Sequence, residues 1–147
     1  MSGDKPASDE ARHAEEMRAR DRATRSLGIA VEVSGAGAAI ARVRVSDDML
    51  NGFGVCHGGH LFALADTAFA FACNSYGVVT VAAGGSIDFL RPAHAGDQLT
   101  ATATERSRGK RTGVYDVVVR NQHGKEVALF RGRSHVTDNP PRSASDP

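Results

Sequence analysis

The most constraining feature of the sequence is a thirteen-residue run, Leu61 to Cys73, in which every side chain except Asp66 and Thr67 is apolar. The run follows a pair of glycines and has the length of a helix. A helix that is apolar on nearly all sides must be enclosed by other elements rather than laid on a surface. The sequence therefore predicts a central helix, over about residues 57–76, that the rest of the chain wraps.

The stretches on either side of this run have the period of two that marks strands. Residues 29–34 and 39–45 flank Gly35-Ala36-Gly37 and predict a β-hairpin. Four further strands are predicted over residues 78–91, 99–108, 112–120 and 126–136, and the segment 121–124 is typical of a hairpin turn.

A stretch of mixed charge between Ser8 and Leu27 predicts one surface helix ahead of the strands, ended by Gly28. The predicted order is a helix, two strands, a long buried helix and four strands. An antiparallel sheet curled around the buried helix satisfies this order with short connections, so the expected fold class is α+β. The 147 residues fit a single domain over residues 9–137. Residues 1–8 and 138–147 are rich in Ser, Pro, Asp and Gly, and we expect them to be disordered.

Charge and cysteine content exclude several classes of protein. Eighteen Lys and Arg against seventeen Asp and Glu leave a net charge of +1, which argues against nucleic-acid binding and against binding to a membrane surface. No stretch approaches the ~18 apolar residues of a membrane helix, and no signal peptide is visible. The two cysteines lack the spacing of a zinc ribbon or a thioredoxin-like motif. We therefore expect a cytoplasmic protein.

Asp66 is the residue of the buried run that most suggests chemistry. A carboxylate in an apolar helix loses several kcal/mol of hydration unless it is paired, hydrogen-bonded or protonated. A core Asp satisfied by neighbouring amides or by Thr67 would explain it without a function. Buried ionisable groups in clefts also mark functional sites, so a catalytic carboxylate is the other interpretation.

The segment His57-Gly58-Gly59 stands directly before the buried helix. Backbone N–H groups in the first turn of a helix have no partner within it and favour negative charge. Glycine lets a substrate carbonyl approach the backbone closely, as an acyl-transfer site demands. An oxyanion site and a plain glycine-rich loop are both consistent with this pattern. Asn51 begins the preceding loop.

The spacing of the two features constrains how they could act together. Eight residues separate Gly58 from Asp66, which is about 12 Å along one helix. An oxyanion donor and an attacking carboxylate must serve the same carbon atom, so the carboxylate would have to come from a second copy of the helix. An antiparallel pair of helices about a two-fold axis would place Gly58 of one subunit near Asp66 of the other.

Other interpretations of this region are weaker. His57 and His60 could bind a metal, but no third ligand accompanies them at a recognisable spacing. Cys56 is better explained as a small buried residue than as a nucleophile activated by His57.

A basic sector lies further along the chain. Residues 105–133 hold eight bases and three acids. Lys110 and Arg111 are the best candidates for binding the phosphates of a large anionic ligand. Strand residues that merely face water would give the same pattern.

Several segments together resemble a known family. MLNGFGVCHGGHLFALADTAFAFACNSYG, followed by SIDFLRP, GDQLTATA, GKRTGVYDV and VALFRGRSH, is similar to the hotdog-fold acyl-CoA thioesterases of the phenylacetate pathway, the PaaI type. The resemblance covers about residues 15–136 and implies the hotdog fold, in which an antiparallel sheet wraps a long central helix.

The resemblance also implies roles for particular residues. Asp66 would be the catalytic carboxylate, as general base or nucleophile, and Gly58 would supply the N–H that polarises the thioester carbonyl. Asn51 would help to place water or substrate. His57, Gly59 and Thr67 would bind substrate, together with Lys110 and Arg111 of the basic sector.

The implied reaction is hydrolysis of an aryl-acyl-CoA, such as a hydroxylated phenylacetyl-CoA, to the free acid and CoA, with no metal or redox cofactor. The implied assembly is a dimer of hotdog dimers with active sites at the dimer interface. Three alternatives stay open: a non-catalytic acyl-CoA-binding module, a thioesterase of broader medium-chain specificity, and an enoyl-thioester dehydratase. The dehydratase would need its own His-centred signature, and the segment HGGHLFALADTA of this chain does not resemble it.

Overall fold

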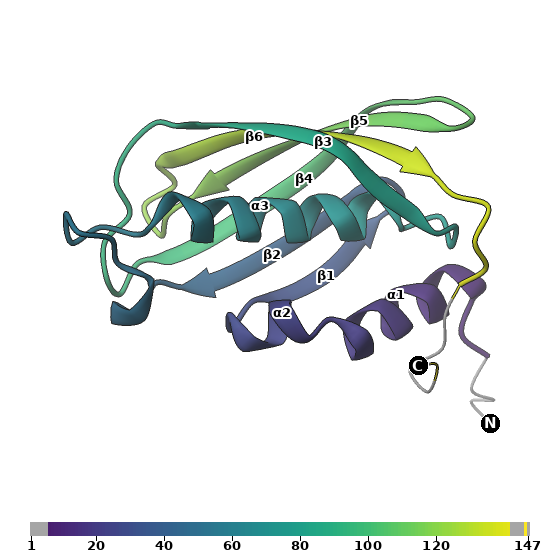
Figure 1. Ribbon diagram of the computed structural model, residues 1–147, viewed down its shortest axis with the longest axis horizontal. Coiled ribbons are helices and arrows are strands. Elements are labelled where there is room, and N and C mark those ends of the chain that lie inside the picture. The colour runs from purple at the N-terminus through teal and green to yellow at the C-terminus, as the bar shows by residue number, and fades with distance from the viewer. Residues whose placement is uncertain (1–5, 142–145, 147) are drawn as a thin grey trace.

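The computed structural model describes residues 6–141 and residue 146. Two short helices, α1 and α2, precede a hairpin, a long helix α3 and four further strands (Figure 1). The elements are α1 Asp9–Arg20, α2 Arg22–Ser26, β1 Ala30–Gly35, β2 Ala38–Arg44, the 3₁₀ turn η1 Asp47–Met49, α3 Gly58–Cys73, β3 Thr80–Phe89, β4 Gln98–Arg108, β5 Thr112–Arg120 and β6 Glu126–Val136.

The strands form one six-stranded sheet in the order β1-β2-β4-β5-β6-β3, with antiparallel pairing throughout. The sheet curls over α3, which lies along its concave face (Figure 1). The α+β prediction of a wrapped central helix is confirmed. No helix in the described part of the chain is long and apolar enough to cross a membrane.

Small residues on the inner face of the sheet let α3 approach it closely. A Cβ atom at Gly132 of β6 would lie 2.8 Å from the ring of Phe69, so glycine is needed there for Phe69 to pack. The Phe69 ring also lies 5.6 Å, between centroids, from Tyr115. Four fully buried alanines of β2 and β4 line the same face: Ala39, Ala41, Ala101 and Ala103. This packing holds α3 against the sheet.

The N-terminal segment differs from the prediction of one helix between Ser8 and Leu27. The chain breaks at Asp21, whose carboxylate accepts hydrogen bonds from the N–H (3.0 Å) and the hydroxyl (2.6 Å) of Thr24 and so begins a second helix. A short polar residue that bonds to the backbone ahead of it favours a helix start over a helix interior. Ser8 caps α1 in the same way, through the N–H of Ala11 (3.1 Å).

The two short helices lie beside β1 (Figure 1). His13 anchors α1, because its Nε2 lies 2.9 Å from Oδ1 of Asn74, just after α3. Arg18 donates to the carbonyl of Val31 on β1 at 3.1 Å. The boundaries at residues 9 and 137 stay a prediction. Residues 1–5, 142–145 and 147, in the termini expected to be disordered, lie outside the described residues.

Candidate active site

The first turn of α3 has one backbone donor that its surroundings leave available. The carbonyl of His57 accepts from the N–H groups of His60 (2.9 Å) and Leu61 (3.4 Å). The Nδ1 atom of the His57 side chain accepts the N–H of Gly59 at 2.9 Å. Among the described residues, the Gly58 N–H makes no hydrogen bond. Gly58 is therefore the residue whose N–H is free to bind a carbonyl oxygen, whereas Gly59 is already bonded.

Glycine at position 58 leaves room for a neighbouring aromatic ring. A Cβ atom at this position would lie 2.8 Å from the nearest ring atom of Phe89, at the end of β3. A side chain here would displace either the ring or the helix start. The contact joins two residues 31 positions apart in the chain, so the sequence did not predict that Phe89 belongs to the site. The only indication in the sequence was the apolar end of a predicted strand just before Pro92.

Asp66 lies two turns further along α3 and is half-buried. Burial raises the pKa of its carboxyl, and the carboxylate of Asp21 raises it further. Thr67 does not satisfy Asp66, because its hydroxyl donates to the carbonyl of Ala63 at 2.7 Å. No hydrogen bond or ion pair to Asp66 is present within the described residues. Asp66 is therefore not a core residue satisfied by its neighbours, and its carboxylate is available to accept a proton.

The helix separates Asp66 from Gly58. Gly58, Phe62 and Asp66 recur every four residues and form one stripe along α3. The eight-residue rise puts the two functional groups about 12 Å apart in one protomer, too far to serve one carbon atom. Beside the stripe, a cavity of about 360 Å³ lies between the first turns of α3 and the η1 segment, lined on the helix by His57, Gly59, His60 and Ala63.

Asn51 shapes the loop that leads into α3. Its side-chain oxygen accepts the N–H groups of Phe53 (2.9 Å) and Val55 (3.3 Å). The β5–β6 turn uses the same device: Asn121 accepts the N–H groups two and four residues ahead of it, both at 3.0 Å. The Nδ2 donor of Asn51 has no partner among the described residues, so it is available to a ligand.

Lys110 and Arg111 are not close to Gly58 in the same chain. They lie in the β4–β5 turn, at the end of the molecule where α3 stops (Figure 1). Arg111 pairs with Asp138 at 3.3 Å, and Lys110 is exposed. Within one protomer, the structure does not join these two residues to the rest of the predicted site.

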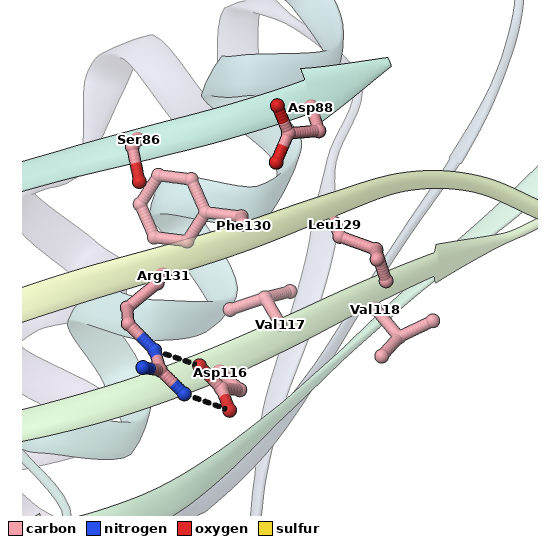
Figure 2. A pocket seen from close by; sticks show the side chains of 8 residues that line it. All are labelled: Ser86, Asp88, Asp116, Val117, Val118, Leu129, Phe130 and Arg131. Carbon is pink, nitrogen blue, oxygen red and sulfur yellow. Dashed lines mark hydrogen bonds and ion pairs between the residues drawn. The ribbon is translucent and has the colours of Figure 1, made fainter. Parts of the chain in front are cut away.

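A second cluster that sequence reasoning missed lies on the outer face of the sheet. Figure 2 shows Arg131 of β6 holding the carboxylate of Asp116 of β5 through two hydrogen bonds, 2.6 and 2.9 Å, with α3 behind the strands. This pairing lowers the pKa of Asp116. The residues border a cavity of about 280 Å³. In the sequence, Asp116 and Arg131 each alternate with apolar or small residues of a predicted strand. Only the register of β5 and β6 shows that the two residues lie opposite each other.

The cysteines and histidines do not form a nucleophile or a metal site within the described residues. Burial raises the pKa of the Cys56 thiol and raises that of Cys73 to about 12, so neither is a ready nucleophile. The described residues contain no group of three or more His, Cys, Asp or Glu side chains placed to hold a metal ion.

Comparisons with known proteins identify the family of the chain. The thioesterase superfamily model matches residues 53–128. Acyl-coenzyme A thioesterase PaaI of Escherichia coli (strain K12) is 54% identical over 123 residues, which cover 84% of this chain and 88% of that protein.

Solved structures give the same result. That of the E. coli PaaI protein from the phenylacetic acid degradation operon has a TM-score of 0.86 at 50% identity, covering 90% of this chain and 96% of that one. The structure of smu.793 from Streptococcus mutans UA159 bound to acetyl CoA has a TM-score of 0.72 at 31% identity, covering 76% and 90% of the two chains. The resemblance to PaaI-type hotdog thioesterases is confirmed. The chain belongs to the thioesterase superfamily, and it is a thioester hydrolase with the hotdog fold, of the acyl-CoA thioesterase kind.

Proposed function

We propose that the protein hydrolyses aryl-acyl-CoA thioesters, hydroxylated phenylacetyl-CoA above all, to the free acid and CoA. The observation that supports this most is the pairing of a free Gly58 N–H at a helix start with an unpartnered, half-buried Asp66 on the same helix stripe. The aryl preference is supported by the name of the E. coli relative, which comes from a phenylacetic acid degradation operon. Acetyl CoA bound to smu.793 supports a CoA thioester as the substrate class.

The proposed active site is built by two subunits. Because Gly58 and Asp66 are too far apart in one chain, we place Gly58 of one subunit opposite Asp66 of its partner, across an antiparallel pair of α3 helices. In that register Phe62, midway between them, faces its own copy at the two-fold axis. Phe62 is 37% exposed, and its ring packs edge-on against Phe130 at 5.2 Å between ring centroids. A partner helix would cover it.

The edge of the sheet supports the same assembly. β3 pairs only with β6, so its other edge is open among the described strands. Small residues, Ala82, Ala83, Gly84 and Gly85, occupy the middle of β3, and a Cβ at Gly85 would lie 2.9 Å from the Phe130 ring. Phe130 also touches Phe62, so one axis could pass close to both the helix stripe and the β3 edge. Two such dimers would make the proposed tetramer.

The chemistry follows from these placements. The thioester oxygen accepts the Gly58 N–H, and the α3 dipole stabilises the negative charge that develops on that oxygen. Asp66 of the partner then either takes a proton from a water molecule, whose oxygen attacks the carbonyl carbon, or attacks that carbon itself. Collapse of the tetrahedral intermediate breaks the C–S bond, and the CoA thiolate leaves and takes up a proton. An anhydride formed by direct attack would be cleaved by water.

The remaining residues of the proposed site would bind substrate or support the groups that act on it. We assign Nδ2 of Asn51 to a water molecule or to the substrate, and His57, through its cap on Gly59, to holding the helix start. Lys110 and Arg111 extend from an exposed turn, where the CoA phosphates could be bound at the surface of the assembly. Thr67, bonded to its own helix, would support Asp66 through the backbone.

Thiol release tests this function. Wild-type protein and Asp66→Asn are assayed with hydroxyphenylacetyl-, phenylacetyl-, benzoyl- and straight-chain acyl-CoAs. We expect hydroxylated aryl substrates to react fastest, and the folded variant to lose ~10²-fold or more in kcat. Equal rates on medium-chain substrates would show a broader specificity. If both proteins bind acyl-CoA without turnover, the chain is a binding module instead.

A further inference from the structure

Phe89 stands beside the free backbone donor of the proposed site. Its ring atoms lie 2.8, 3.1 and 3.4 Å from where a Cβ atom of Gly58 would be. The side chain is nevertheless 54% exposed, and its neighbour Leu90 is 46% exposed. Large apolar side chains that stay open beside a polar donor are typical of a binding surface. The tip of the ring, its Cζ and two Cε atoms, lies against the helix start, which leaves the rest of the ring open to another group.

The geometry brings any bound carbonyl close to this ring. The Cβ position of a residue is about 2.5 Å from its own amide nitrogen, and an oxygen that accepts the N–H is about 2.9 Å from it. A thioester oxygen bound to Gly58 therefore lies at most about 8 Å from the tip of the Phe89 ring. A group attached to the carbonyl carbon is within reach of that ring.

The chemistry of the ring selects the acyl side of the thioester. The CoA arm continues from sulfur into a chain of amides, which need polar partners. The acyl group is the apolar part of the substrate, and Phe89 and Leu90 offer an apolar wall. We propose that Phe89 is a specificity-determining residue, which packs against the acyl group and favours an aromatic ring over an alkyl chain. This inference rests on the proposed function.

The test compares two substrates that differ only in the acyl group. The ratio of kcat/KM for phenylacetyl-CoA to that for hexanoyl-CoA is measured for wild type, Phe89→Leu and Phe89→Tyr. Aromatic pairs prefer each other beyond the effect of buried area, so we expect Phe89→Leu to lower the ratio about three- to tenfold. Phe89→Tyr keeps the ring and should hold the ratio within about twofold of wild type. Thermal unfolding of each variant shows that the fold is intact.

Two results would overturn the proposal. If Phe89→Leu slows both substrates equally, the ring only supports Gly58 or contacts the shared CoA arm. If Phe89→Leu changes neither kcat/KM value, the acyl group does not touch Phe89. Absence of turnover of every acyl-CoA by wild type would contradict the proposed function alone. In that case the thioesters stay intact, and the dissociation constants of phenylacetyl-CoA and hexanoyl-CoA for wild type and the Phe89 variants still decide the role of Phe89.

Discussion

Two residues of α3 each keep a polar group without a hydrogen-bond partner, and both groups are of a kind that takes part in catalysis. Gly58 keeps an N–H without an acceptor although its neighbours are capped, and Asp66 keeps a carboxylate without a donor. Polar groups that are this close to a core are usually satisfied. A group left unsatisfied in the free protein can be satisfied by a substrate, and its stabilisation is then available in the transition state.

The first prediction is that removing the charge of Asp66 stabilises the protein. Burial and Asp21 raise the pKa of Asp66 in the folded state above its unfolded value, so ionisation weakens the fold as pH rises through this interval. Asp66→Asn should therefore raise Tm near neutral pH, and the difference from wild type should shrink as the pH is lowered and Asp66 becomes protonated. Calorimetry across the acid range measures this.

The matched control has the opposite sign. Arg131 lowers the pKa of Asp116, so ionised Asp116 stabilises the fold above its unfolded pKa. Asp116→Asn should lower Tm near neutral pH. A fall in Tm for Asp66→Asn as well would mean that Asp66 is a structural residue with a partner.

A second prediction concerns Asp21, which sequence reasoning did not single out. Its negative charge raises the pKa of Asp66, which must be ionised to act as base or nucleophile. Asp21→Asn should move the acid limb of the pH profile of kcat/KM to lower pH. The amide oxygen of Asn can still accept the Thr24 N–H and so keep α2. Glu32→Gln, at an exposed carboxylate of β1, should leave the limb unchanged. If the acid limb of Asp21→Asn does not shift, the charge of Asp21 has no effect on the ionisation that limits activity.

At the scale of elements, the loop before α3 and the β5–β6 turn provide a natural pair. Asn51 and Asn121 make the same turn, but only Asn51 stands next to the proposed site. Either residue changed to Ala should lose stability by about 0.5–2 kcal/mol, as lost side-chain caps do. Only Asn51→Ala should also lose activity, as thiol release and urea unfolding would show together.

Asn51→Asp separates the turn from the ligand donor. A carboxylate accepts both turn N–H groups, so stability should stay close to wild type, while the Nδ2 donor is gone. Activity should fall with it. Full activity in Asn51→Asp would restrict Asn51 to shaping the loop.

The elements were predictable from the sequence because local patterns determine them. The all-round apolar run gave α3, and the alternation of small and apolar residues gave the strands. The break at Asp21 was missed because one capping side chain outweighed the helix-forming residues around it. The Phe89–Gly58 contact and the proximity of Asp21 to Asp66 depend on how distant segments pack, which periodicity does not encode.

The spacing of Gly58 and Asp66 has its consequence at the scale of the whole molecule. A rigid helix fixes the separation, so no rearrangement within one chain can bring both groups to one carbon atom. Two copies about a two-fold axis solve the problem twice, and each complete site then takes one group from each chain. The assembly is in this view part of the catalytic machinery.

Mixing two inactive variants tests whether each site is shared. Gly58→Pro removes the backbone N–H, and proline is well tolerated at the first position of a helix, after an extended residue such as His57. Gly58→Pro and Asp66→Asn should each be inactive alone, because every site lacks one group. After subunit exchange in an equal mixture, half of the dimers are mixed, and each mixed dimer has one site with both groups intact. Thiol release should then recover to about a quarter of the wild-type rate. If Gly58 and Asp66 acted within one chain, every site would keep a defect and the mixture would stay inactive. Mass spectrometry of the mixture shows that exchange has occurred, so an inactive exchanged sample would count against the shared site.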